Sequence, residues 1–489
     1  MRTVPGPTDR IVVVGAGLGG LAAALRLAGA GRAVTVLEQR EGPGGVAGQL
    51  NIDGYSFDTG PTVLTLPEVI ADTLGSVGEE LDDWLDLVPL DPIYRAFYPG
   101  GEHLDIRADP EATEAGIEAF AGPDEAAGYR RFVEWLRALH RTQMRHFVDR
   151  NIDSPLGLVG PELARLAALG GFGRLEPAVR RFLRDPRVRR AFTFQSLYVG
   201  LSPHEALALY AMIAYLDTVA GVVFPRGGIH TVPQALAGAA AKHGVTFRYG
   251  TMVESVETAA GRARAVRTTD GERIPADAVV LAADLPHVFR DLLNRRPPTL
   301  RTAPSCVLVH VGSSARYSKI AHHNIHFGRA WRRTFRELTR TGELMSDPSL
   351  LVTNPTRTDP SLAPAGRQTY YVLAPAPNTD APIDWSVVGP RYADELLTTL
   401  HARGYGGFAD AAEVVRVVTP ADWQAAGLSA GTPFAAAHTM RQTGPFRPGN
   451  LVAGLDNVVL AGAWTHPGVG VPMVLLSGRL AAERITGPR

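Results

Sequence analysis

The sequence predicts an α/β fold with a parallel sheet at its start, and three observations near the N-terminus carry that prediction. Residues 11–14 (IVVV) form a short apolar run typical of a buried strand, and a helical pattern over residues 21–28 follows a glycine-rich turn. A second apolar run, residues 33–37 (AVTVL), is rich in β-branched side chains and ends at Glu38. This order of strand, glycine turn, helix, strand and acid indicates a Rossmann-like domain that binds a dinucleotide.

The glycine turn, residues 15–20 (GAGLGG), has the spacing that a phosphate-binding loop needs. Gly15 permits a tight turn, and Gly17 lets a pyrophosphate approach the backbone because it has no side chain. Gly20 allows the helix to pack closely on the strand. The helix N-terminus directs unpaired N–H groups and the positive end of its dipole at the phosphates. We therefore expect the cofactor site to include Gly15, Gly17, Gly19 and Gly20.

The residues from Glu38 onward favour FAD as the dinucleotide. The Glu38 carboxylate can accept hydrogen bonds from ribose hydroxyls, and its charge argues against the 2′-phosphate of NADP. A second glycine pair, Gly44 and Gly45, implies another close backbone approach to a long cofactor, which NAD sites do not usually need. Residues 53–62 then read as a hairpin that runs into a turn. The alternative is a loop-rich crossover; on the FAD interpretation we expect contacts from Glu38, Gln39, Gly44, Gly45, Gly60, Pro61 and Thr62.

Composition bounds the class of protein. The 489 residues are 45% hydrophobic, which is enough for a large core and two or more domains. Lysine plus arginine and aspartate plus glutamate number 49 each, so the net charge argues against a general nucleic-acid binder. The single cysteine, Cys306, excludes a disulfide framework and fits a reducing compartment. Residues 1–10 lack the apolar segment of a signal peptide.

Two further patterns have structural and functional interpretations. The longest apolar stretch, residues 206–224, matches a membrane span in length, but Asp217 within it would cost roughly 3 kcal/mol at mid-bilayer. We therefore expect a buried helix that turns into a strand at residues 222–224. The apolar positions of residues 155–169 lead into seven arginines between Arg174 and Arg190, which fits either a solvated basic face or docking on an anionic bilayer.

The second half of the chain returns to the cofactor. Residues 245–256 and 278–282 read as strands, and residues 458–461 form a strand that runs into a Gly/Pro turn. A helix follows from residue 473 to 485, and its start can direct N–H groups at a flavin ring or its ribityl chain. Within these segments the expected cofactor contacts are Val253, Gly462, Val471, Pro472 and Met473.

The expected architecture is a Rossmann-like FAD-binding domain with a discontinuous sheet-plus-helix substrate domain. Three histidines, at positions 322, 323 and 326, cluster without an acid or cysteine at ligand spacing, so no metal site is expected. The expected division is an FAD-binding domain of residues 1–70, 221–290 and 450–489, a substrate domain of residues 71–110 and 291–449, and a helical subdomain of residues 111–220 that can associate with a membrane.

These features together resemble the bacterial phytoene desaturases (carotenoid dehydrogenases), a family within the amine-oxidase-like FAD flavoproteins. The resemblance covers nearly the whole chain. The stretches that carry it are residues 13–22, 57–63, 221–228, 359–364, 371–375 and, most specifically, 465–472 (THPGVGVP). Three positions depart from the family pattern: Val46 replaces an arginine that usually contacts the cofactor, Trp464 replaces a glycine, and Met473 replaces a small residue. The last two are expected near the flavin, where they could change which polyene or bond is accepted.

The resemblance implies a non-covalent FAD enzyme that dehydrogenates phytoene or a related carotene taken from the membrane. A C–H bond beside a double bond would lose hydride to flavin N5, and a proton would leave the adjacent carbon. Asp217, alone in its apolar run, and His466, beside the flavin turn, are the candidates for handling that proton. Structural alternatives for Asp217 are a helix cap or a buried ion pair with Arg226, and the alternative for His466 is a turn residue that binds backbone.

Other functions remain open at this point. An amine oxidase, a carotenoid isomerase or saturase, and a non-catalytic flavin-binding scaffold would share the same cofactor site. The resemblance further implies a peripheral protein on the inner, cytoplasmic face of the cell membrane. It leaves quinone or oxygen as the electron acceptor.

Overall fold

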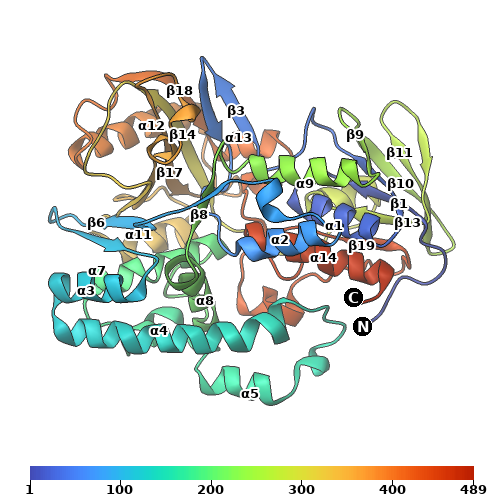
Figure 1. The fold of residues 1–489 in the computed structure, drawn as a ribbon, viewed down its shortest axis with the longest axis horizontal. Helices are drawn as coiled ribbons and strands as arrows, with labels where there is room; N and C mark the ends of the chain where they lie inside the picture. The colour runs from blue at the N-terminus through green and yellow to red at the C-terminus, as the bar shows by residue number, and fades with distance from the viewer. Residues whose placement is uncertain (489) are drawn as a thin grey trace.

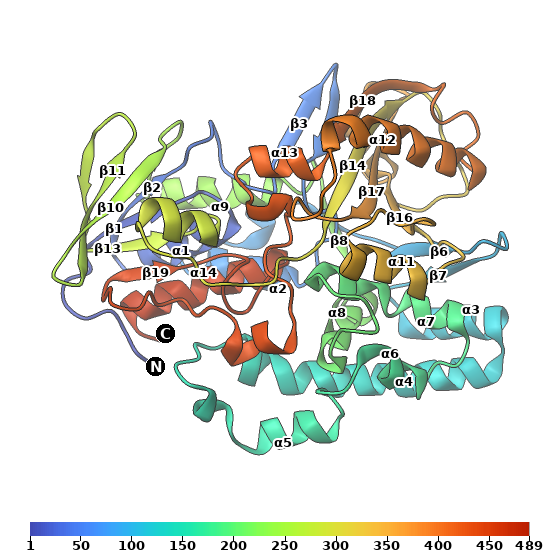
Figure 2. The same cartoon turned by 180° about the vertical axis from the view of Figure 1, so that it is seen from behind.

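The chain places two large β-sheets side by side, with a layer of helices beneath the mixed sheet that extends toward the parallel one (Figure 1). The computed structural model describes residues 1–488. The N- and C-termini lie close together beside the first sheet, and the reverse view shows the same arrangement (Figure 2). The expected α/β fold with a Rossmann-like domain is confirmed.

The first sheet is parallel and contains the strands that the sequence predicts. Its order is β19 (Val458–Leu460), β13 (Ala278–Leu281), β1 (Arg10–Val14), β2 (Ala33–Leu37) and β9 (Thr246–Arg248). All residues of β13 and β19 are buried, as expected for strands covered on both faces. The N-terminal, middle and C-terminal parts of the chain therefore build one sheet.

Helix α1 (Leu18–Gly29) packs between α9 (Thr231–Lys242) and α14 (Val471–Thr486). Helices α1 and α14 contact each other at glycine residues, Gly19 in α1 and Gly478 in α14. A Cβ atom on Gly478 would overlap the carbonyl oxygen of Gly19. Because two helix backbones meet without side chains between them, the ends of α1 and α14 are brought to the same place.

Smaller antiparallel units surround this sheet. The hairpin expected within residues 53–62 begins earlier, as β3 (Gln49–Ile52) and β4 (Tyr55–Asp58), and the strand expected at residues 222–224 is present as β8 (Val223–Pro225), which pairs with β5 (Leu87–Pro89). The strands of the ribbon beside the parallel sheet are β10 (Val253–Ala259), β11 (Arg262–Thr268) and β12 (Arg273–Pro275).

The second large sheet is mixed, and one of its faces packs on α12 (Trp385–Ala402). Its opposite face, which includes Cys306 and Tyr371, packs against α13 (Pro420–Ala425). The strand order is β18 (Ala412–Val418), β14 (Ser305–Ser313), β17 (Gln368–Ala376), β16 (Leu350–Thr353), β15 (His323–His326), β6 (Tyr94–Phe97) and β7 (His103–Ile106).

The helical layer occupies the region from residue 110 to 220, as expected. Residues 206–224 form a broken helix, with a π turn at Leu216–Ala220, followed by β8. None of the helices in residues 1–488 is long and apolar enough to cross a bilayer. The remaining helices are α2 (Pro67–Gly75), α3 (Pro110–Ala121), α4 (Pro123–Gln143), α5 (Pro161–Ala168), α6 (Leu175–Arg180), α7 (Pro186–Ala191), α8 (Ala211–Tyr215), α10 (Leu285–His287) and α11 (Arg332–Arg336).

The arginine-rich segment is in part the solvated basic face that the sequence allowed, because four of its arginines are exposed and the three in α7 are partly buried. Arg187 pairs with Asp185 at 2.7 Å, and the Arg190 guanidinium stacks over Trp331. Arg189 also lies within ion-pair distance of an acid. The three arginines of α7 are therefore paired or stacked with other side chains of the protein.

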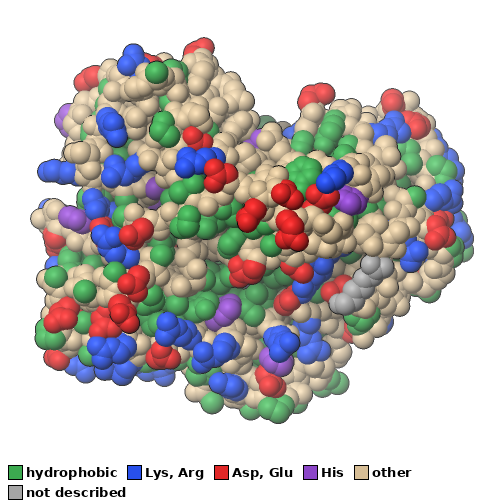
Figure 3. All heavy atoms as spheres, viewed as in Figure 1, with side chains coloured by type: hydrophobic (Ala, Val, Ile, Leu, Met, Phe, Trp, Pro, Cys, Tyr) green, Lys and Arg blue, Asp and Glu red, His purple; other side chains and the backbone are tan. Residues whose placement is uncertain are grey.

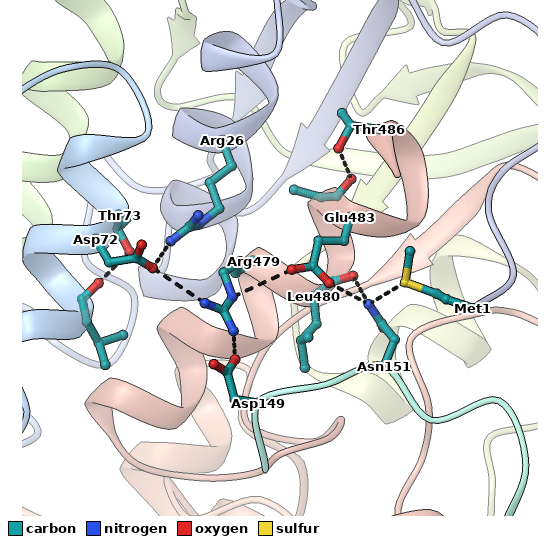
Figure 4. A network of polar contacts seen from close by, with 12 residues as sticks. Met1, Arg26, Asp72, Thr73, Asp149, Asn151, Arg479, Leu480, Glu483 and Thr486 are labelled. Carbon is teal, nitrogen blue, oxygen red and sulfur yellow. Dashed lines mark hydrogen bonds and ion pairs between the residues drawn. The ribbon is translucent and has the colours of Figure 1, made fainter. Parts of the chain in front are cut away.

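A network of charged side chains fastens the helical layer to α14 (Figure 4). Arg479 of α14 contacts Asp149, in the segment after α4, and Asp72 of α2 at 3.6 Å. Asn151 donates to Glu483 at 3.0 Å. The chain that leaves α4 toward α5 is therefore fixed against the helix that begins at the cofactor site.

Gly20→Ala tests the helix–strand contact. A Cβ atom at Gly20 would overlap the Gly15 carbonyl oxygen, so we expect a loss of about 1–3 kcal/mol or more in unfolding free energy. Gly75→Ala in α2 is the control, because its Cβ meets nothing within 4 Å. Thermal unfolding should show a lower midpoint for Gly20→Ala alone; equal midpoints for both variants would contradict the prediction.

Candidate functional site

The glycine loop between β1 and α1 has the conformation of a phosphate cradle. Gly15 has φ of 103°, which disfavours any residue with a side chain, and Gly17 caps α1 with open space where a Cβ would lie. A Cβ on Gly19 would meet the Gly462 backbone at 3.2 Å. Gly20 instead faces Gly15, so its role is packing.

Glu38 is fixed by the loop that it serves. Its Oε2 atom accepts a hydrogen bond from the Ala16 N–H at 2.7 Å, and Oε1 accepts from the Arg40 N–H at 2.9 Å. The carboxylate is buried at the cavity wall beside Gln39. The remaining lone pairs on its two oxygens can accept hydrogen bonds from ribose hydroxyls.

The second glycine pair packs directly on the first loop. The Gly44 N–H donates to the Ala16 carbonyl at 2.9 Å, and a Cβ on Gly45 would lie 3.3 Å from the Gly17 Cα. Arg40 donates to the Gly45 carbonyl at 2.6 Å. The two glycine motifs therefore form one continuous surface, whereas the sequence alone predicted two separate places where the backbone approaches a cofactor.

One cavity of about 1390 Å³ joins these segments. All the residues expected to hold the cofactor line it except Gly20. They are Gly15, Gly17, Gly19, Glu38, Gln39, Gly44, Gly45, Gly60, Pro61, Thr62, Val253, Gly462, Val471, Pro472 and Met473.

The cradle fits a dinucleotide with a flavin. The N-terminus of α1 and that of α14 both face the cavity, so two sets of unpaired N–H groups are available to phosphate and ring oxygens. Gly462 has open space where a side chain would stand, at φ of 120°. Backbone groups and Glu38 thus provide an elongated polar trough without bulky side chains, which is the form that FAD needs.

Beyond the trough the cavity becomes an apolar channel. Tyr371 of the mixed sheet donates a hydrogen bond to the Gly60 carbonyl at 2.8 Å and so joins the channel wall to the cofactor segment. The channel runs between the helical layer and the mixed sheet. Its walls include Tyr198, Val199, Leu209, Met212, Ile213 and Leu216 on one side and Cys306, Leu351, Leu373, Trp423, Leu428 and Phe434 on the other.

Exposed apolar side chains gather where the channel meets the surface near α5. The set, called the apolar rim here, comprises Leu156 (80% exposed), Val159 (70%), Phe172 (40%), Met440 (47%) and Phe446 (58%). Three of these, and neighbours of the other two, line the cavity. Such a concentration of exposed large apolar groups marks an interaction surface.

Asp217 lies in the channel wall on the π turn that follows α8. Its side chain is buried, and within residues 1–488 no group donates a hydrogen bond to its carboxylate. Burial raises its pKa from 3.8 to about 7. The ion pair with Arg226 that the sequence allowed is wrong, because Arg226 bonds Asp86 at 2.8 Å on the surface.

His466 also lines the cavity, and its imidazole binds backbone. Nε2 lies 3.1 Å from the Val148 carbonyl, which can only accept, so Nε2 carries the proton. Burial is the main cause that lowers its pKa to about 4, and the nearby Arg447 charge adds to the effect. His466 is therefore neutral at physiological pH, and the backbone-bound alternative describes its structure.

Asp58 is a structural anchor that the sequence did not single out. Its carboxylate accepts hydrogen bonds from the backbone N–H of Ile229 at 2.9 Å and of His230 at 3.1 Å. His230 in turn contacts the Ala47 carbonyl at 2.8 Å. Residues 57–63 and 221–228 are both recognisable as motifs in the sequence. Only the fold shows that Asp58, in the first motif, binds the backbone of the residues that directly follow the second.

A dinucleotide trough that opens into a buried apolar channel defines a flavin-dependent oxidoreductase. The family model described as "Flavin containing amine oxidoreductase" matches residues 18–486. The "Phytoene dehydrogenase" of Streptomyces griseus is 57% identical and covers 100% of this chain and 97% of its own length. The "zeta-carotene-forming phytoene desaturase" of Myxococcus xanthus is 39% identical, with 97% and 93% covered. The chain belongs to this flavoprotein family, and within it to the bacterial phytoene desaturases; its cofactor is FAD.

Solved structures share the fold at low sequence identity. An oxidoreductase from Methanosarcina mazei superposes with a TM-score of 0.65 at 16% identity, covering 96% of this chain and 99% of the other. The cyclohexylamine oxidase of Brevibacterium oxydans gives 0.62 at 16% identity, with 98% and 99% covered. These similarities establish the architecture. The substrate has to be inferred from the residues of the site.

Glu38→Ala should weaken FAD binding. It removes a charged acceptor from two backbone donors, and each such bond contributes about 1.5–3 kcal/mol, so we expect at least about a tenfold loss in affinity. Glu41→Ala, at an exposed neighbouring position, is the control. Titration of flavin-stripped protein with FAD measures both; equal affinities would show that Glu38 does not hold the cofactor.

Proposed function

We propose that this protein is an FAD-dependent desaturase that introduces C=C bonds into phytoene or a related carotene. The names of its relatives support the substrate class. The observation that carries the proposal is the continuity of the FAD trough with a long apolar channel, because a water-insoluble polyene needs such a path to reach the flavin.

When bound, FAD supplies a hydride acceptor for a C–H bond next to a double bond. The chain's own contribution is to hold the polyene straight and to exclude water. The buried leucines, valines and aromatic residues of the channel do both without competing polar groups. An allylic cation forming on a polyene is delocalised along it, so strong acid–base groups are not required.

We propose that Asp217 accepts the proton that leaves the substrate. Its carboxylate faces the channel, and a pKa of about 7 makes it ionised in part and basic enough to accept a proton. His466 stays neutral, with its Nε2–H held by Val148. We propose that it shapes the flavin end of the channel rather than storing the proton.

The pH dependence tests this assignment. Asp217 must be ionised to accept a proton, so turnover should rise with pH and level off above about 7. Asp217→Asn should lose about 10²- to 10⁴-fold in turnover and flatten that limb. Asp86→Asn, at the surface, is the control. Unchanged turnover in Asp217→Asn would remove Asp217 from the mechanism.

The same pKa has the opposite consequence for stability. The folded-state pKa of about 7 lies above the ordinary 3.8, so the folded protein binds this proton more tightly than the unfolded chain. The stabilisation is fully present below pH 3.8 and is lost as pH rises through about 7. The loss of stability with rising pH should be absent in Asp217→Asn. This measurement therefore distinguishes a variant that is folded but catalytically impaired from one that is misfolded.

The reaction itself is tested by mixing FAD-loaded protein anaerobically with phytoene in liposomes. Bleaching of the oxidised-flavin band together with a longer polyene chromophore supports the proposal. Geometric isomers without flavin reduction would indicate an isomerase, and saturation of a polyene by reduced enzyme would indicate a saturase. Bleaching by amines alone would indicate an amine oxidase.

We further propose that the protein works as a peripheral protein on the inner face of the cell membrane, with quinone or oxygen as acceptor. Carotenes reside in bilayers, and the apolar rim surrounds the channel where it meets the surface. Figure 3 shows hydrophobic side chains at the lower edge, over α5, with lysine and arginine side chains directly above them. Arg145, Arg165 and Arg441 are exposed in this part of the chain.

Replacing three rim residues tests membrane docking. Leu156→Ser, Val159→Ser and Phe446→Ser in one variant should weaken co-sedimentation with anionic liposomes at least about tenfold, because exposed apolar area is removed. Val387→Ser and Val415→Ser form the matched control, since both residues are comparably exposed on other elements. Equal liposome binding by both variants would rule out the rim as the docking surface.

The domain division is part of the same proposal. We assign residues 1–70, 221–290 and 450–489 to FAD binding and residues 71–110 and 291–449 to the substrate. Residues 111–220 form the helical subdomain. Support comes from the parallel sheet, whose strands all fall in the first set, and from the mixed sheet, whose strands all fall in the second.

A further inference from the structure

A polar clasp made of Asp284, Ser429 and Trp464 lies at one end of the cavity. Asp284 follows β13, Ser429 begins the 3₁₀ turn Ser429–Gly431 after α13, and Trp464 lies between β19 and α14. Asp284 Oδ2 accepts hydrogen bonds from the Trp464 indole N–H at 3.0 Å and from the Ser429 N–H at 3.2 Å. The Ser429 hydroxyl donates to the other carboxylate oxygen. Three distant segments therefore meet on one carboxylate.

The clasp holds the indole of Trp464 in one position. The side chain is 7% exposed and packs in the apolar cluster that contains Leu285, Ala435 and Leu460. Turning the ring away would remove a donor from a partly buried carboxylate and expose apolar surface. Trp464 is thus a fixed part of the cavity wall.

The clasp and the apolar rim lie at different ends of the same cavity. Near the clasp the lining includes the exposed residues 425–427, at the end of α13. At the other end the lining includes residues before and within α5. Both ribbon views place α13 and α5 on opposite sides of the molecule (Figures 1 and 2).

The wall that approaches the clasp suits a hydrocarbon. Cys306, Leu373, Trp423 and Phe434 come from β14, β17, α13 and the segment after it, and they form part of one apolar cluster. A polyene can lie along them without leaving polar groups unpaired. At the clasp this apolar path meets an anchored indole and a carboxylate whose oxygens are already bonded.

We propose that Trp464, held by Asp284 and Ser429, is the end-stop of the polyene channel and so limits the number of desaturation steps. This inference rests on the proposed function. A linear substrate that enters at the apolar rim advances toward the clasp, and its depth decides which C–C bond lies against the flavin. Trp464 then determines specificity by position, while Asp284 and Ser429 are positioning residues that act through it.

Trp464→Ala should lengthen the channel and shift the products of phytoene toward more desaturated carotenes. Because the channel gains the length of an aromatic ring, we expect the product ratio to change by about tenfold. Trp464→Phe keeps most of the bulk but loses the N–H, so a smaller shift is expected. Ser429→Ala and Asp284→Asn loosen the indole without emptying its site and should shift products in the same direction. Trp331→Phe, in a ring cluster away from the cavity, is the control.

Two measurements accompany the product analysis. Flavin content is measured for each variant, because a residue that only held FAD would lower it without changing the product ratio, and that result would overturn the end-stop. Quenching of tryptophan fluorescence by bound phytofluene, which absorbs where indole emits, should be weaker in Trp464→Phe than in Trp331→Phe. Equal quenching in both variants would also overturn the proposal.

Failure of the proposed function is distinguishable from failure of the end-stop. If the wild type desaturates no carotene, the desaturase proposal fails, and the quenching difference alone decides whether a polyene reaches Trp464. If the wild type desaturates phytoene and all FAD-loaded Trp464 variants give wild-type product ratios, the end-stop is wrong and the desaturase proposal stands.

Discussion

The close contact between α1 and α14 is the constraint on which the site depends. Gly19 and Gly478 let the two helix backbones approach without side chains between them, and Gly19 also lies against Gly462. Because α1 comes from the start of the chain and α14 from its end, this contact brings two helix N-termini to one cavity. A methyl group on Gly478 would overlap the Gly19 carbonyl oxygen, and one on Gly19 would meet the Gly462 backbone at 3.2 Å.

The substrate side is fastened to this trough by buried polar groups whose partners lie far along the chain. Tyr371 bonds the Gly60 carbonyl, and Asp58 bonds the backbone at Ile229 and His230. Burial raises the pKa of Asp58 to about 6 even though the two N–H donors oppose the shift. An ionised carboxylate in that position is tolerated because both donors face it, so the charge fixes the turn instead of destabilising the core.

The sequence predicted the parts of the site that depend on local order. The glycine loop, the acid at Glu38 and the start of the last helix, predicted at residue 473 and observed at Val471, are each encoded within a few residues, and the structure places them on one cavity. It could not predict contacts between distant segments. The ion pair of Arg226 and the clasp at Asp284 depend on which strands become neighbours, and that follows from packing over the whole chain.

The channel also shifts the pKa values of two of its ionisable groups, Asp217 and His466, toward the uncharged forms. An apolar path long enough for a polyene removes water from every side chain that it meets, and this desolvation raises the pKa of Asp217 and lowers that of His466. Both shifts move toward the uncharged form, although one group is an acid and the other a base. A buried carboxylate whose pKa lies near neutrality can still accept a proton in such a channel, and hydride removal from a delocalised polyene requires alignment together with such an acceptor. The chemistry that the site can perform is thus selected by the same burial that lets the substrate enter.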